Sequence, residues 1–137
     1  MLDRTRFLAR LIGVYCLLAA LMMGLQRAAM IAAVSAAVHD APLMLVLGTI
    51  TLAAGLALVL SHNLWSGGAL TVVVTLIGWL TLLKGLMFWV LPPGAVAAEL
   101  YLERLHYAQL YYLYCAFTLA TGLYLTLGGF RAPPPAR

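Results

Sequence analysis

Residues 41–83, APLMLVLGTITLAAGLALVLSHNLWSGGALTVVVTLIGWLTLL, decide the fold, because their 43 positions contain no Asp, Glu, Lys or Arg. A helix needs about 20 apolar residues to cross the roughly 30 Å hydrocarbon core of a membrane. The stretch is therefore long enough for two crossings and must reverse between them. Its only polar, glycine-rich break is SHNLWSGG at 61–68, where a tryptophan suits the membrane–water interface. We expect membrane-spanning helices at 42–61 and 68–91.

The residues that flank these two helices explain their limits. Asp40 is placed to cap the first helix, and Pro42 fits its first turn because a missing N–H costs nothing there. Pro92 and Pro93 end the second helix, because proline removes an N–H and disfavours helix in the residue before it.

Two further spans are expected in the other long gaps between charges, at 7–25 and 105–128. The helical pattern of the last span begins near Ala95, so this helix should extend beyond the bilayer. The tail at 132–137 contains three consecutive prolines and is expected to be disordered.

Residues 26–39 connect the first two spans and contain a helical pattern of their own. Their larger apolar residues fall on one face of a helix, as Met30, Ile31, Val34 and Val38. We interpret the segment as a short helix lying in the membrane interface. The alternative is a bent continuation of the first span, and the sequence does not choose between them.

Composition agrees with four crossings: 65% of the 137 residues are hydrophobic and 9% are charged, against about half and about a quarter in an ordinary soluble domain. These values exclude a soluble domain and a disordered chain, and two cysteines are too few for a disulfide scaffold. We therefore predict an all-α fold, an integral membrane four-helix antiparallel bundle that forms a single domain over 1–131.

The arginines are divided unequally between the two ends of these spans. Four crossings put both termini on one side, together with Arg4, Arg6, Arg10, Arg131 and Arg137, whereas Arg27 and Arg104 lie on the other. The positive-inside rule then places both termini in the cytoplasm. The Ala-, Leu- and Arg-rich composition is typical of bacteria with GC-rich codons, so we expect a bacterial inner (plasma) membrane. The net charge of +4 reflects this topology and does not indicate a nucleic-acid partner.

Small residues recur at helical spacing in every span. In lipid, helices associate through close packing of such residues. The set comprises Ala20, Gly24, Gly48, Thr51, Gly55, Thr71, Thr75, Gly78, Gly85, Thr118 and Gly122. We interpret these positions as packing seams within the bundle.

Lys84 is the only charge more than one helical turn inside a span, and ionisable residues within membranes are candidates for a functional role. It lies about 10 Å from the outer end of its helix, so its side chain can also reach the interface or an acidic partner. Tyr111 and Tyr114 lie deep in the last span, where their hydroxyls need partners. These three residues are candidates for a ligand or ion pathway, in which a quinone or a lipid head group would fit.

Acidic and histidine side chains gather at the expected outer surface, as His39, Asp40, Glu99, Glu103 and His106. Glu103 and His106 have the i, i+3 spacing with which helical bundles present metal ligands. A di-iron site needs more carboxylates than the four in the chain, so the metal alternative is a mononuclear ion. The simpler interpretation is a solvated helix face, and we expect no cofactor.

The loop and the helix after it carry a recognisable pattern. His62, Asn63 and Trp65 precede a helix that contains Thr75, Gly78, Trp79, Lys84 and Gly85. This pattern resembles a family of small bacterial inner-membrane proteins of unknown function, over about 50 residues. The resemblance implies a four-helix membrane fold and brings no activity. His62, Asn63 and Trp65 are either a capped turn or a loop that docks a cytoplasmic partner.

The sequence contains no nucleophile–base pair, phosphate-binding loop or paired-cysteine motif, so we expect a protein that is not an enzyme. The preferred interpretation is an oligomer or an accessory subunit of a larger membrane complex, with membrane lipid and protein partners. One alternative is a small transporter or channel that uses Lys84 and the outer acidic cluster. The other is a metal- or quinone-binding membrane protein with its site at Glu99, Glu103 and His106.

Overall fold

The computed structural model of the chain describes residues 2–91 and 108–131, which form five helices. The helices are α1 (Leu2–Leu25), α2 (Arg27–His39), α3 (Ala41–Ser61), α4 (Ala69–Val90) and α6 (Ala108–Phe130). All but α2 are long and apolar enough to cross a membrane. The prediction of an all-helical chain with four long apolar helices is thus confirmed. The expected extension of the last helix from Ala95 lies outside the described residues, as does the 132–137 tail.

The junction between α2 and α3 follows from local capping. The Asp40 side chain accepts a hydrogen bond from the Leu43 backbone N–H at 3.0 Å, as the sequence predicts for the start of α3. Pro42 occupies the first turn, where its missing N–H has no helical partner to lose. The two helices are therefore separated by a single residue that ends one and begins the other.

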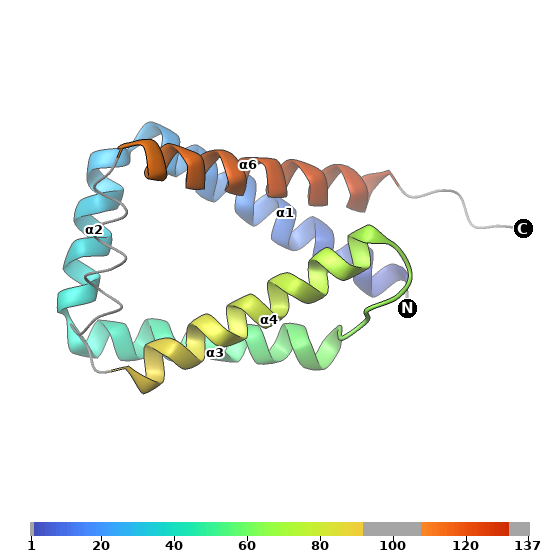
Figure 1. Cartoon of the computed structure of the whole chain (residues 1–137), viewed down its shortest axis with the longest axis horizontal. Helices are drawn as coiled ribbons and strands as arrows, with labels where there is room; N and C mark the ends of the chain where they lie inside the picture. The colour runs from blue at the N-terminus through green and yellow to red at the C-terminus, as the bar shows by residue number, and fades with distance from the viewer. Residues whose placement is uncertain (1, 92–107, 132–137) are drawn as a thin grey trace, which may run out of the picture.

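α2 is a separate helix rather than a continuation of α1. The break is Gln26, whose backbone angles of φ −127° and ψ 48° are not helical. Figure 1 shows α2 running across the direction of the long helices, at the end where α1 finishes and α3 begins. This orientation is the one expected of a helix lying in a membrane interface, which remains a prediction for α2.

α3 and α4 pack against each other through glycines on both helices. A Cβ added at Gly55 would overlap the backbone of Leu82, and one added at Gly85 would lie 2.5 Å from Leu52 Cα. Residues nearer the start of α3 contact residues nearer the end of α4, so the two helices run in opposite directions. The close approach repeats at seven-residue intervals, at Gly48 and Gly55 and at Gly78 and Gly85. These four glycines were expected in packing seams.

α1 and α6 form a second pair of the same kind. A Cβ at Gly13 would lie 2.7 Å from the Thr126 backbone nitrogen, and one at Gly122 would lie 2.9 Å from the Leu17 nitrogen. Gly24 was expected in this seam, and that prediction is wrong: it is exposed, and an added Cβ would meet no atom within 4 Å. Gly24 lies on an exposed face of α1, although the neighbouring Met23 is buried against Tyr111 of α6.

The two pairs meet at one end of the molecule. Ala9 and Ile12 of α1, Val74 of α4 and Leu125 of α6 form a buried cluster, against which Leu58 of α3 packs. Figure 1 shows the pairs converging at this end, which also holds the start of α1 and the α3–α4 connection, and separating toward α2. A second cluster at the α2 end joins α1, α2 and α6 through Met23, Tyr111, Met30, Ile31, Val34 and Cys115.

Candidate functional site

Lys84 lies on an exposed part of α4, one helical turn before Phe88. Its Nζ is 5.6 Å from the centroid of the Phe88 ring, within the range of a cation–π contact. The side chain therefore extends toward the end of α4, which is the direction that a lysine takes when it reaches for the membrane surface.

The two candidate tyrosines occupy different environments on α6. Tyr111 is 1% exposed, and its hydroxyl donates a hydrogen bond of 2.7 Å to the Met23 backbone carbonyl. That bond supplies the partner that a buried tyrosine hydroxyl needs, and it ties the start of α6 to the end of α1. Tyr114 is 46% exposed. The structure thus places Tyr111 in the core and Tyr114 on the outer surface, rather than along one shared lining.

His39 and Asp40 lie side by side in the chain at the α2–α3 junction, where both are used in local contacts. The His39 Nδ1 is 2.7 Å from the Ser35 backbone carbonyl, and Asp40 caps α3. The other candidate metal ligands, Glu99, Glu103 and His106, lie outside the described residues. Within 2–91 and 108–131, no group of three or more His, Cys, Asp or Glu residues could hold a metal ion.

The loop between α3 and α4 is folded against α4 by side-chain hydrogen bonds. Asn63 Oδ1 accepts from the Trp65 indole N–H at 3.0 Å and from the Trp79 indole N–H at 3.3 Å. The buried Thr75 hydroxyl donates to the Leu64 carbonyl at 2.8 Å and accepts from the Leu64 N–H at 3.3 Å. The side-chain oxygen of Asn63 is therefore engaged within the chain.

His62 and Trp65 differ in accessibility within the same loop. His62 is 3% exposed, and its Nε2 finds no hydrogen-bond partner among the residues that the structure describes. Trp65 is 57% exposed. Of the three loop residues proposed for partner docking, Trp65 is the one with a large free face.

A cationic site that the sequence did not indicate lies at the start of α2. The Arg27 guanidinium carbon is 5.4 Å from the centroid of the Tyr111 ring and 5.6 Å from that of Tyr112. The two rings meet edge to face at 5.7 Å. Arg27 thus reaches from the α1–α2 junction to the start of α6. Sequence spacing carries no signal for this contact, because 84 positions separate Arg27 from Tyr111.

Arg27 also has an unsatisfied donor. Its Nε is buried and has no hydrogen-bond partner among the described residues. An unmade hydrogen bond from a buried charged group costs roughly 1–3 kcal/mol or more. Ring faces attract the cation but do not replace an oxygen acceptor in the plane of the guanidinium.

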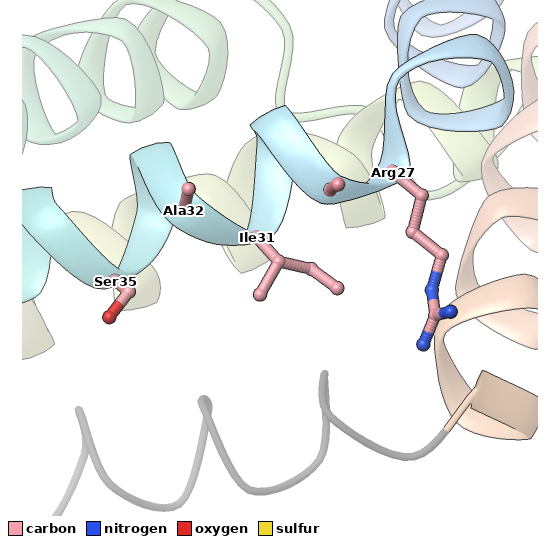
Figure 2. A pocket seen from close by; sticks show the side chains of 5 residues that line it. Arg27, Ile31, Ala32 and Ser35 are labelled. Atoms are coloured by element: carbon pink, nitrogen blue, oxygen red, sulfur yellow. The ribbon is translucent and has the colours of Figure 1, made fainter.

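A cavity of about 550 Å³ opens beside this arginine. Among the residues that the structure describes, those lining it are Arg27, Ala28, Ile31, Ala32 and Ser35, all from α2. Figure 2 shows Arg27, Ile31 and Ser35 extending to one side of the helix, with the guanidinium next to the start of α6. The cavity therefore has a cation at one end, an apolar wall in the middle and a hydroxyl at the other end.

No family model matches the chain, and neither a curated protein nor a solved structure gives a match. The resemblance carried by the loop residues His62, Asn63 and Trp65 and by residues 75–85 of α4 is therefore not accompanied by a matching family model. Four apolar helices are compatible with an integral membrane protein, and the site geometry is the remaining guide to function.

Proposed function

We propose that the chain is a non-enzymatic integral protein of the bacterial inner membrane, which assembles as an oligomer or as an accessory subunit of a larger membrane complex. In this proposal the two helix pairs form one antiparallel four-helix unit. Both termini lie in the cytoplasm and α2 lies in the opposite interface.

The observation that carries the proposal is that small residues of the long helices face a partner helix, whereas large apolar residues face outward. Glycines of α3 and α4 pack against the partner helix, as do Gly13 of α1 and Gly122 of α6. Large apolar side chains instead cover the outer faces: Ile50, Leu60, Leu113 and Phe117 are all exposed. Exposed apolar area on this scale needs lipid or another protein against it.

The arrangement of the helix ends supports the proposed orientation. Arg10 donates from Nε to the Gly129 carbonyl at 2.9 Å, so the start of α1 and the end of α6 lie together. The α3–α4 connection is at this same end (Figure 1). Arg4, Arg6, Arg10 and Arg131 then belong to one side and Arg27 to the other, which is the asymmetry that the positive-inside rule associates with the cytoplasm.

The use of hydroxyl groups supports a structural role for the long helices. Thr49, Thr51, Thr81 and Thr118 each donate to the backbone carbonyl four residues earlier. Such bonds satisfy a hydroxyl within its own helix. Among the described residues, these groups line up with no acid or base that would activate them.

The test is cysteine cross-linking in native membranes. In a variant lacking Cys16 and Cys115, a single cysteine is placed at Ile50 or at Leu113 on an outer face, and at the buried Val74 as the control. We expect a cross-linked product from at least one outer position and none from Val74. Native mass measurement should then give a multiple of 14.7 kDa or a stoichiometric complex. A 14.7 kDa monomer with no cross-link at either outer position would refute the proposal.

A further inference from the structure

We propose that the cavity beside Arg27 binds the phosphate group of a membrane phospholipid. The proposed residues are Arg27 for the phosphate, Ile31 for the adjoining apolar part of the lipid, and Ser35 for a polar group of the head region. The lipid origin of the ligand rests on the proposed membrane location, whereas binding of an anion rests on the cavity alone.

The first step is the unsatisfied donor of Arg27. The buried Nε lacks an acceptor among the described residues, and the guanidinium lies against the faces of Tyr111 and Tyr112. These contacts hold the planar group in position and leave its buried Nε without an acceptor among the described residues. A guanidinium fixed in this way is suited to bidentate hydrogen bonding, which favours phosphate and carboxylate oxygens.

The second step is the length and chemistry of the cavity. Beyond Arg27 its wall is formed by Ala28, Ile31 and Ala32, and the Ser35 hydroxyl follows two turns along α2. A free inorganic phosphate would use only the end at Arg27. An amphiphile would use both the cation and the apolar wall, so the lining favours a phospholipid over the free ion.

The third step is the depth at which the site lies. Arg27 follows the apolar stretch Arg4–Leu25 by two residues, and Tyr111 is near the beginning of Gln109–Phe130. In a chain that crosses the membrane with these helices, both residues lie at the boundary between hydrocarbon and head groups. Arginine and tyrosine are the residues expected at that depth, and the lipid phosphate lies at the same level.

The experiment measures lipid binding to the purified full chain in detergent by native mass spectrometry. The probes are phosphatidylglycerol, phosphatidylcholine and inorganic phosphate, each titrated separately. Arg27→Gln removes the charge, and Arg131→Gln is the matched control, since Arg131 is an exposed arginine at the other end of the molecule. Arg27→Lys keeps the charge without the planar donor, and circular dichroism checks that each variant remains helical.

We expect one phosphatidylglycerol per chain, with affinity about tenfold weaker in Arg27→Gln and unchanged in Arg131→Gln. Arg27→Lys should bind with intermediate affinity, and phosphatidylcholine should bind less tightly because its choline offsets the phosphate charge. Equal phosphatidylglycerol binding by the wild type and helical Arg27→Gln would overturn the site. Inorganic phosphate that binds as tightly as the lipid and displaces it would overturn the lipid assignment. Either outcome is separate from cross-linking at Ile50 and Leu113, which tests assembly.

Discussion

Replacement of Gly85 by alanine tests whether α3 and α4 approach each other as closely as their glycines indicate. The added methyl group would lie 2.5 Å from Leu52 Cα and would also overlap the Leu52 backbone nitrogen. Carbon atoms in ordinary contact are about 3.5–4.0 Å apart. The two backbones would therefore have to separate locally by about 1 Å, because no flexible side chain can move aside.

The expected cost follows from two opposing effects. Inserting a methylene-sized group into a well-packed contact typically lowers the free energy of unfolding by about 1–3 kcal/mol. Alanine improves helix propensity over glycine by at most about 1 kcal/mol. Gly24→Ala is the matched control, because its methyl group would meet no atom within 4 Å. Both variants gain helix propensity, so most of that gain cancels when they are compared. We therefore expect Gly85→Ala to be less stable than Gly24→Ala by about 1–3 kcal/mol.

Gly78 adds an intermediate point to the series. A Cβ there would lie 3.1 Å from the Leu58 Cβ, so the two helices would have to separate by only a few tenths of an ångström. The expected order of stability is Gly24→Ala, then Gly78→Ala, then Gly85→Ala. Unfolding by sodium dodecyl sulfate in mixed micelles, followed by tryptophan emission, measures this order. The three tryptophans at 65, 79 and 89 all belong to α4 or to the loop before it. Equal stability of all three variants, or a reversed order, would refute the close approach.

Two further predictions concern hydrogen bonds that hold the helix ends. Tyr111→Phe should lower the free energy of unfolding by about 1–3 kcal/mol, because it leaves the Met23 carbonyl without its buried donor. Tyr112→Phe is the control: its ring is exposed, so the free energy of unfolding should change by less than about 0.5 kcal/mol. Equal effects in chemical denaturation would contradict this assignment. Asn63→Ala should cost about 1 kcal/mol and shift the Trp79 indole N–H resonance in NMR spectra, since Asn63 Oδ1 accepts from that indole; an unchanged resonance would show that the loop is held in another way.

The helices could be predicted because each depends on residues close in sequence. The uncharged stretch at 41–83 is long enough for two spans, and its polar break coincides with the α3–α4 connection. Asp40 and Pro42 mark the start of α3 through capping and backbone chemistry that act within one turn. The separation of α2 from α1 could not be predicted, because it depends on the backbone angles of Gln26, an ordinary residue for either conformation.

The packing seams were predicted most completely where the partner helix is adjacent in sequence, although Gly122 of the α1–α6 seam was also recognised. A short loop makes α3 and α4 neighbours, and their four seam glycines were recognised. The partner of α1 is α6, more than 80 residues away, so nothing local indicates which face of α1 it covers. Gly13 was therefore overlooked although its added Cβ would lie 2.7 Å from the Thr126 nitrogen, and Gly24 was included although nothing packs against it.

The same distance in sequence explains why Arg27 was considered only for its effect on orientation. Arg10 and Arg27 both reach from the N-terminal part of the chain to α6 and both contact aromatic rings, Arg10 at Phe130 with 4.6 Å to the centroid. They differ in their acceptors: Arg10 Nε donates to the Gly129 carbonyl, whereas Arg27 Nε has no acceptor among the residues described. Cations near the carboxyl end of a helix are stabilised by the carbonyls exposed there, so Arg10 completes its own site. Arg27 Nε lacks such a carbonyl among the described residues, and this difference between two arginines that both contact α6 supports the α2 end as the proposed place for a phosphate.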